Sequence, residues 1–293
     1  MNKLLGSKKI ICLFVLPALF LFAAIVLLPI GISAYYSLLD WDGIGAASFA
    51  GLKNYVRLFT DPVNAFPQAI WNSLLLVLLS VFVQLPIALI LALILANGVK
   101  GENFYRTIYF IPVVLSTVVI GQLWTKIFQP EYGLLNTLLN SLGLGHLAGQ
   151  WLADPKTALL CAIIPTVWQY IGYHMLLFYG GIKAIPNDVF EAAKIDGASP
   201  VQVSLRITIP LIRSTMKTCV IFAVIGSLKV FDIVYIMTKG GPMHASEVPS
   251  TLMYNAIFYK NQYGYGSSMS IFIVLECLIF TYLIQKAFRK DNT

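Results

Sequence analysis

Long apolar stretches alternate with short polar segments along this chain. A helix that spans a membrane needs about 20 mainly apolar residues, and the pattern predicts six such spans. The predicted spans are Ile10–Tyr36, Ile70–Ala96, Thr107–Phe128, Thr157–Ile182, Leu211–Met237 and Ser268–Lys286. The chain is therefore expected to be an all-α, polytopic membrane protein.

The composition agrees with this fold class. Only 11% of the 293 residues are charged and 58% are hydrophobic, whereas a soluble domain carries about 25% charged residues. These values exclude a soluble globular enzyme, a disordered chain and a fibrous repeat. The net charge of +7 does not indicate nucleic-acid binding, because the basic residues fall between apolar runs and form no stripe beside aromatic residues.

The first predicted span follows a basic segment, as the apolar region of a cleaved signal peptide does. Its apolar stretch runs from Ile10 past Ile30, which is longer than the roughly 7–15 residues expected of a signal peptide. We therefore expect this helix to be retained.

The distribution of Lys and Arg predicts the orientation, because cytoplasmic loops carry an excess of both. With the N-terminus inside, thirteen of the 20 cations fall on the inner side: Lys3, Lys8, Lys9, Lys100, Arg106, Lys183, Lys194, Arg206, Arg213, Lys217, Lys286, Arg289 and Lys290. Six fall on or near the outer side: Lys53, Arg57, Lys126, Lys156, Lys239 and Lys260. Lys229 lies within a span. Both termini are therefore expected in the cytoplasm.

The outer segment 129–156 carries leucines at helical spacing. They are Leu134, Leu135, Leu138, Leu139 and Leu142. The spacing predicts a short amphipathic helix on the outer face. Its role is left open between lying on the membrane or capping the bundle, and contacting an external partner.

The cytoplasmic loop between the fourth and fifth spans is predicted to hold a short helix. Pro186 breaks the preceding helix, and Asp188 with Glu191 has the spacing of a capping box, with Asp in place of Ser or Thr. The helix is expected to run to about Asp196, and Gly197 suits a left-handed C-terminal cap. A rigid helix here either offers a grip to another protein or lies at the headgroups, and the residues alone leave both open.

The same loop resembles a known family. Glu191-Ala192-Ala193 is followed after three residues by Gly197, and after nine more by Ile207-x-Ile209-Pro210. This spacing is similar to the EAA loop of binding-protein-dependent ABC importer permeases. The only departure is Ile209, where the family pattern has Leu, and the exchange is a mild apolar one.

Two further segments resemble the carbohydrate-uptake branch of these permeases. They are Gly51-Leu52-Lys53-Asn54-Tyr55 after the first span, and the stretch from Phe231 to Gly240-Gly241-Pro242 at the end of the fifth. Both are similar to the maltose- and glycerol-phosphate-type first permeases, and the resemblance covers essentially the whole chain.

The resemblance implies a type I ABC importer permease fold in a bacterial or archaeal plasma membrane. It implies a single membrane domain over residues 1–293, with a first helix at 10–36, a transport core at 70–286 and a coupling loop at 186–210. In such a loop the residues that contact the ATPase would be Glu191, Ala192, Ala193, Asp196 and Gly197. The implied partners are a second homologous permease, an ABC ATPase dimer, an extracytoplasmic solute-binding protein, a carbohydrate and the lipid bilayer.

No catalytic or metal-binding pattern is found in the chain. It contains no phosphate loop of the form G-x-x-x-x-G-K-[ST], and the three histidines, His146, His174 and His244, are far apart. The four cysteines lie inside apolar runs and are interpreted as small buried hydrophobes: Cys12, Cys161, Cys219 and Cys277. We expect no enzyme activity and no cofactor in this chain, and the resemblance implies that ATP and Mg are bound by the partner ATPase subunits.

Polar residues within a span are costly and usually face the bundle interior or a wet cavity. In the fourth span, such residues share one helix face at i, i+3, i+4 and i+7: Thr166, Gln169, Tyr170 and Tyr173. Hydroxyls, an amide and flat rings suit a sugar, and the alternative is polar packing between helices.

The fifth span has a face of mostly small residues at the same spacing. It consists of Ala223, Gly226, Ser227 and Val230. This face either lines the same cavity or allows close helix packing. The resemblance favours a sugar site between these two helices.

Three ionisable residues lie inside predicted spans. Lys229, Asp232 and Glu276 are predicted to form a charge cluster near the outer gate, in which Lys229 pairs with Asp232, Glu276 or both. A charge on the partner permease is an alternative partner for Lys229.

The predicted function is import of a sugar or oligosaccharide, driven by ATP hydrolysis in partner subunits. An ion-coupled secondary transporter is the alternative, and the three intramembrane charges are its only candidate coupling site. A membrane-embedded enzyme would need converging catalytic groups at one level, which the sequence does not provide.

Overall fold

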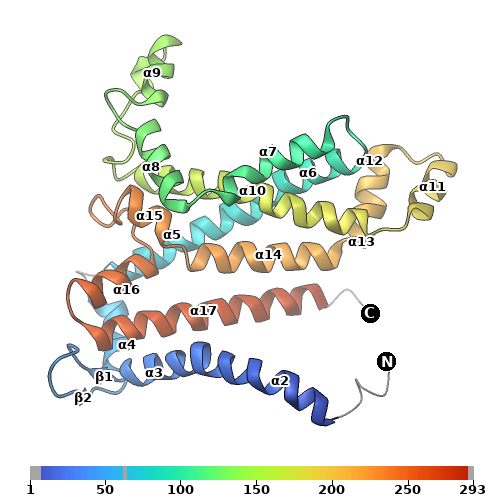
Figure 1. Ribbon diagram of the computed structural model, residues 1–293. Helices are drawn as coiled ribbons and strands as arrows, with labels where there is room; N and C mark the ends of the chain where they lie inside the picture. Colours follow the sequence, from blue (N-terminus) through green and yellow to red (C-terminus); the bar gives the residue numbers. More distant parts are fainter. Residues whose placement is uncertain (1–7, 62–64, 290–293) are drawn as a thin grey trace. The chain divides into compact units, whose positions relative to one another are not determined.

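Helices occupy all six predicted spans in the computed structural model, which describes residues 8–61 and 65–289 (Figure 1). The spans consist of α2 (Lys8–Phe22), η1 (Ala23–Leu27) and α3 (Leu28–Tyr36); α5 (Phe66–Leu79), η2 (Ser80–Gln84) and α6 (Leu85–Ala96); α7 (Glu102–Val114) and α8 (Thr117–Ile127); α10 (Ala158–Lys183); α14 (Arg213–Leu228) and α15 (Asp232–Met237); and α17 (Tyr263–Arg289). Within the described residues, five helices are long and apolar enough to cross a membrane, or six if the bent pair α7–α8 forms one span.

Short elements connect the spans. They are β1 (Leu39–Asp40), β2 (Ser48–Phe49), α4 (Lys53–Thr60), α9 (Leu134–Ser141), η3 (Gly145–Leu147), α11 (Asn187–Ile195), α12 (Pro200–Val203), η4 (Ser204–Thr208), α13 (Ile209–Leu211) and α16 (Pro249–Phe258). The predicted amphipathic helix in the outer segment 129–156 is confirmed as α9, which exposes Leu134 and Leu138 and partly buries Leu135 and Leu139.

Contacts between residues divide the chain into two units, of which the first comprises 1–62 with 253–274. Its centre is Asn54, whose side-chain amide donates to the carbonyls of Ser37 and Leu39 at 2.9 and 2.8 Å. The backbone of Gly264 lies against the Leu39 carbonyl, where no side chain would fit. This unit therefore fastens the loop after the first span to the start of α17. The predicted single membrane domain over 1–293 remains a prediction.

The second unit comprises residues 63–252 with 275–293, and α10 runs through it beside α6 and α7 (Figure 1). A side chain at Gly172 of α10 would collide with the backbone of Tyr109 and Phe110 in α7. Glycine at this position therefore allows the two backbones to touch. A core of Met175, Phe178 and small residues packs α10 against α6 and α14.

The third predicted span is not a straight helix. It is divided into α7 and α8, which meet at an angle of 94°. Leu115 is extended, and the hydroxyl of Ser116 accepts from the Val118 N–H at 3.3 Å as the N-cap of a new helix. Gly121 then brings α8 close to Ile236 of α15. The predicted span Thr107–Phe128 is thus formed by a bent pair of helices, because a cap within the apolar run starts a second helix.

The fifth predicted span is also divided. The helix α14 ends at Leu228, and α15 begins at Asp232. Non-helical backbone at membrane depth is tolerated where it lines a cavity or is buried in protein, and the residues of this break line the cavity described below.

A cluster of charged and aromatic side chains joins the ends of α6, α7 and α10 near α11. The Glu102 carboxylate accepts a hydrogen bond from the Tyr179 hydroxyl, and Arg106 lies over the Tyr179 ring at 4.4 Å. Lys183 donates to the carbonyl of Ala96 at 3.2 Å and lies 4.0 Å from Glu102. We call these residues the Glu102 cluster.

Some predictions concern residues that the structure does not describe. Lys3 and Lys290, which were counted for the orientation, lie outside the described residues, as do the side chains of Lys8, Lys9 and Cys12. Cys161 and Cys219 are buried free thiols and Cys277 is a partly buried one, which confirms the interpretation of these three as small hydrophobes.

Candidate functional site

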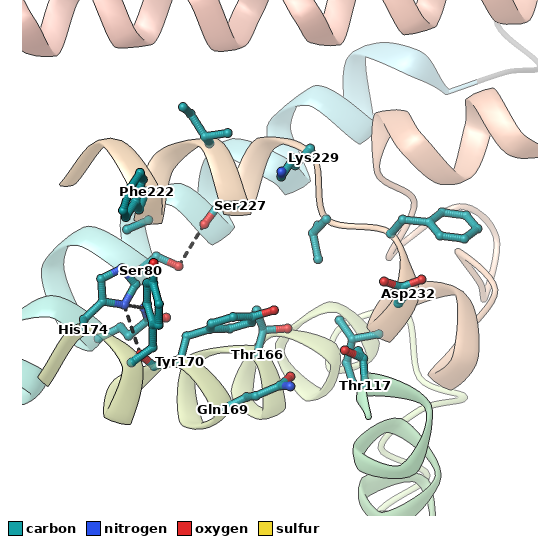
Figure 2. Close-up of a pocket in the computed structure, with 18 residues that line it drawn as sticks. Ser80, Thr117, Thr166, Gln169, Tyr170, His174, Phe222, Ser227, Lys229 and Asp232 are labelled. Atoms are coloured by element: carbon teal, nitrogen blue, oxygen red, sulfur yellow. Dashed lines mark hydrogen bonds between the residues drawn. The ribbon is translucent and has the colours of Figure 1, made fainter. Parts of the chain in front are cut away.

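A cavity of about 390 Å³ lies between the fourth and fifth spans. Its lining includes all eight residues of the polar and small faces identified in the sequence: Thr166, Gln169, Tyr170, Tyr173, Ala223, Gly226, Ser227 and Val230. Figure 2 shows Thr166 and Tyr170 on α10 facing Ser227 and Lys229 across this cavity. The two helix faces therefore border one cavity, which is one of the two alternatives that the sequence left open for the fifth span.

The α10 wall carries polar groups that are free to bind a ligand. Gln169 is only 3% exposed, and its amide forms no hydrogen bond with any described residue. The hydroxyls of Tyr170 and Tyr173 likewise have no hydrogen-bond partner in the described part of the chain, whereas that of Thr166 donates to the Ala162 carbonyl at 3.2 Å. These groups line the cavity and have donors and acceptors to offer, so this wall is suited to a hydroxylated ligand.

The α14 wall combines open space with close packing. An added side chain at Gly226 would meet no atom within 4 Å, so this glycine borders the cavity and not another helix. Ser227 is buried and donates to the hydroxyl of Ser80 at 2.9 Å. Gly226 therefore faces the cavity, which was the first alternative for this face, whereas Ser227 also packs against another helix, which was the second.

The second span supplies a wall that the sequence analysis did not anticipate. Ser80 and Gln84 are each 2% exposed, line the cavity and stand at the two ends of the π-helical turn η2. The Gln84 amide nitrogen lies 2.9 Å from Nδ1 of His174, which is also 3.0 Å from the Tyr170 carbonyl. The sequence signal that could have revealed this wall is the pair of polar residues Ser80 and Gln84, which lie four positions apart in the predicted span 70–96.

The three intramembrane charges do not form ion pairs in this structure. Lys229 and Asp232 are exposed and line the cavity (Figure 2). Glu276 is 8% exposed on α17, and one of its carboxylate oxygens is buried without a hydrogen-bond partner. Within the described residues, no two of the three lie within the 4.0 Å of a salt bridge. The predicted pairing of Lys229 remains a prediction.

The predicted helix of the cytoplasmic loop is present as α11, which stands apart from the helices of its unit beyond α12 (Figure 1). It ends at a left-handed Gly197 with φ of +73°. The Gly197 N–H donates to the Lys194 carbonyl at 3.2 Å and the Ala198 N–H to the Ala193 carbonyl at 3.0 Å, which is a Schellman cap. The prediction that glycine ends this helix is confirmed.

The start of α11 differs from the prediction. The N-cap is Pro186, which has no side-chain hydrogen bond, so Asp188 lies inside the first turn and forms no capping box with Glu191. The helix starts earlier because Pro186 itself adopts the extended N-cap conformation, with ψ of 140°. A capping box does occur further on, where Ser199 and Gln202 bond reciprocally at the start of α12.

The proposed ATPase-contact residues lie along one short segment of the loop. Glu191, Ala192, Asp196 and Gly197 are exposed, and Ala193 is buried at 5%. Ile195, which is not a motif residue, is 86% exposed. The helix therefore presents both charged and apolar groups outward.

The bent and broken spans, the polar cavity between them and the projecting loop helix are together typical of a multi-pass membrane protein of the transport class. No group of three or more His, Cys, Asp or Glu side chains within residues 8–61 and 65–289 is arranged to hold a metal ion.

Comparisons with known proteins give the family. The description "Binding-protein-dependent transport system inner membrane component" matches residues 84–292. The chain is 39% identical to the probable ABC transporter permease protein YurN of Bacillus subtilis, with 97% of both chains covered. It is 34% identical to the trehalose/maltose transport system permease protein MalF of Thermococcus litoralis, covering 97% of this chain and 96% of that one.

The chain belongs to the family of binding-protein-dependent transport system inner membrane components, which are permeases of ABC transporters. A solved structure of a bacterial ABC transporter involved in alginate import has the same fold, with a TM-score of 0.82 at 23% identity over 98% of this chain and 97% of that one. Membership of this family supports the ABC importer over the ion-coupled alternative.

Proposed function

We propose that this permease carries a sugar or oligosaccharide through the cavity between α10 and α14. The observation that carries the proposal is the amide of Gln169, which is 3% exposed at the cavity wall and has no hydrogen-bond partner among the described residues. The hydroxyl groups of a sugar supply such partners, and its CH faces pack on tyrosine rings such as Tyr170 and Tyr173. Relatives named for trehalose/maltose and diacetylchitobiose transport support this substrate class.

The transport cycle is proposed to be alternating access powered by partner subunits. A second homologous permease completes the pathway, an ATPase dimer binds ATP and Mg on the cytoplasmic side, and a solute-binding protein delivers substrate outside. A crystal structure of the alginate transporter in complex with a sugar-bound periplasmic protein supports the last partner. The excess of inner lysine and arginine supports a plasma-membrane orientation with both termini in the cytoplasm.

The helix α11 is proposed to dock into the ATPase and to transmit closure of the ATPase dimer as a rigid-body movement. Glu191, Ala192, Asp196 and Gly197 supply exposed contact groups, while Ala193 is packed inward. The Schellman cap supports this role because it fixes the direction in which the chain leaves the helix.

Substitution of Gln169 tests the substrate proposal. Gln169→Leu is similar in size but forms no hydrogen bond, so we expect the KM for uptake of the transported sugar to rise by about tenfold. The measurement is ATP-dependent uptake of radiolabelled sugar into proteoliposomes that contain the assembled transporter.

The matched control is Gln122→Leu, since Gln122 is exposed on α8 and does not line the cavity. An unchanged KM in the Gln169 variant, together with unchanged ligand binding, would overturn the proposed cavity. Uptake that follows an ion gradient and not ATP would overturn the importer mechanism.

The intramembrane charges are proposed to pair in another state of the cycle. Lys229 is exposed at the cavity, and Glu276 has an unpartnered buried oxygen in the structure described here, so both groups have capacity for a new contact. We expect Lys229→Glu and Glu276→Lys each to reduce uptake strongly and their combination to restore a substantial part. Absence of rescue in the double variant would exclude this pair and favour a charge on the partner permease.

A further inference from the structure

A second cavity, of about 630 Å³, lies where the coupling loop joins the helices of its unit. The ends of α6 and α10 form one side, and α11, α12 and η4 form the other. Lys183 and Lys194 line the cavity, and none of its lining residues is Asp or Glu. The cavity is therefore positively charged.

The two lysines differ in how far their charge is compensated. Lys183 lies 4.0 Å from Glu102 and donates to the Ala96 carbonyl, with 45% of its side chain exposed. Lys194 on α11 is exposed and has no ion pair within the described residues. One ammonium group is thus held in place by protein groups, while the other is available to an anion.

A hydroxyl at the cavity wall gives a second indication of a ligand. Thr208 is 3% exposed as a whole residue and lines the cavity, and its hydroxyl forms no hydrogen bond with a residue that the structure describes. This hydroxyl can therefore donate to an acceptor oxygen of a ligand in the cavity. The remaining walls include Leu93, Ile182, Phe190 and Val203, so the cavity suits a molecule with an anionic end and an apolar body.

We propose that this cavity binds the phosphate headgroup of an anionic phospholipid from the inner leaflet. Basic pockets between spanning helices on the cytoplasmic side are suited to anionic headgroups. The proposal rests on the cytoplasmic orientation given above. Lys194 and the Thr208 hydroxyl bind the phosphate oxygens, Lys183 adds charge, and the apolar walls cover the glycerol and the upper acyl chains.

The bound lipid would act on coupling because its two main contacts come from different segments. Lys194 belongs to α11 and Thr208 to η4, while Lys183 ends α10. A phosphate that contacts all three would hold α11 against the end of the helical bundle. The inner-leaflet composition would then set how firmly α11 is held during transport.

Lipid retention by the intact complex tests this proposal. The assembled transporter is placed in nanodiscs of phosphatidylcholine with phosphatidylglycerol, and the phosphatidylglycerol retained after detergent extraction is counted by native mass spectrometry. We expect about fivefold weaker retention for each of Lys183→Gln and Lys194→Gln, and about fivefold weaker retention for Thr208→Val.

Control variants distinguish lipid binding in the cavity from a general effect of cationic charge and from a loss of ATPase docking. Lys100→Gln with Arg206→Gln removes two exposed cations outside the cavity, and Thr218→Val repeats the threonine substitution elsewhere; neither should change retention. Thr208 is buried, so its variant should keep the ATPase subunits bound while it loses lipid.

Three results would overturn the proposal. The first is equal retention in wild type and in the Lys183→Gln/Lys194→Gln variant. The second is displacement of phosphatidylglycerol by millimolar inorganic phosphate, which would indicate a site for soluble phosphate. The third is a crosslink from Thr208→Cys to an ATPase subunit, which would show that protein fills the cavity.

Discussion

Gly197→Pro is expected to abolish substrate-stimulated ATP hydrolysis and sugar uptake while the chain still inserts and assembles. Gly197 has a φ of +73° and its N–H donates to the Lys194 carbonyl. Proline fixes φ at about −65° and has no N–H, so the left-handed conformation and the hydrogen bond to the Lys194 carbonyl are both lost. The loop then leaves α11 in a different direction. The ATPase activity of the assembled complex, with and without loaded binding protein, measures the effect.

Other substitutions at Gly197 serve as controls, because they change the backbone conformation that this residue prefers. A Cβ added at Gly197 would meet no atom within 4 Å, so backbone preference is expected to decide the outcome. Gly197→Asn should retain most coupling because asparagine tolerates the left-handed region, and Gly197→Val should be intermediate or severe. Normal stimulated hydrolysis in the assembled Gly197→Pro complex would refute the proposed role of the cap.

Gly226→Leu is expected to reduce uptake by about tenfold or more, because leucine and the sugar would compete for the same space, and overfilling a packed site costs about 1–3 kcal/mol. The cavity is about 390 Å³, and Gly226 lines it with no atom within 4 Å of an added side chain. Leucine here would project into the space proposed for the sugar. The measurement is sugar uptake into proteoliposomes, with the amount of assembled complex determined in parallel.

Gly180→Leu is the matched control for this prediction. Gly180 lies on α10, also has no atom within 4 Å of an added side chain, and does not line the cavity. Its variant should transport normally. Uptake by Gly226→Leu at the level of the control would mean that the substrate passes elsewhere. Loss of assembly in Gly226→Leu alone would instead indicate a helix contact at this position.

The sequence was sufficient to locate the membrane helices because bilayer thickness requires every spanning apolar run to reach a minimum length of about 20 residues. The interruptions inside the runs were not located. The bend before Ser116 and the break after Leu228 each depend on a local backbone event within apolar sequence. A serine in an apolar run is compatible with a continuous helix as well as with a cap, so composition does not distinguish the two.

Regular helical periodicity predicted which residues of α10 and of α14 share a face at the cavity. The faces of α10 and α14 follow the i, i+3, i+4, i+7 spacing, and their residues line one cavity, which was one of the two alternatives left open for the α14 face. The contribution of Ser80 and Gln84 was missed because η2 is a π-helical turn, which rotates side chains away from the regular α-helical positions. Such a turn has no composition signal, and it depends on the contacts of Ser80 with Ser227 and of Gln84 with His174.

In the coupling loop, likewise, the end of α11 was predictable from the sequence and its start was not. Glycine is nearly unique in its access to the left-handed region, so the end of α11 was predictable at Gly197. Many residues are tolerated before a first turn, and the true N-cap at Pro186 could not be separated from a capping box at Asp188. Motif spacing identified the family more firmly than it identified the helix boundary.

The Glu102 cluster has a mechanical consequence for force that enters through α11. Because Glu102, Tyr179 and Lys183 connect the ends of three helices at the base of the loop, we expect a load applied to α11 by the proposed ATPase docking to be shared by α6, α7 and α10. The stiffness of this connection then depends on the four side chains of the Glu102 cluster. Substitution of Tyr179 or Glu102 should therefore make the connection more flexible, although the loop itself is unchanged.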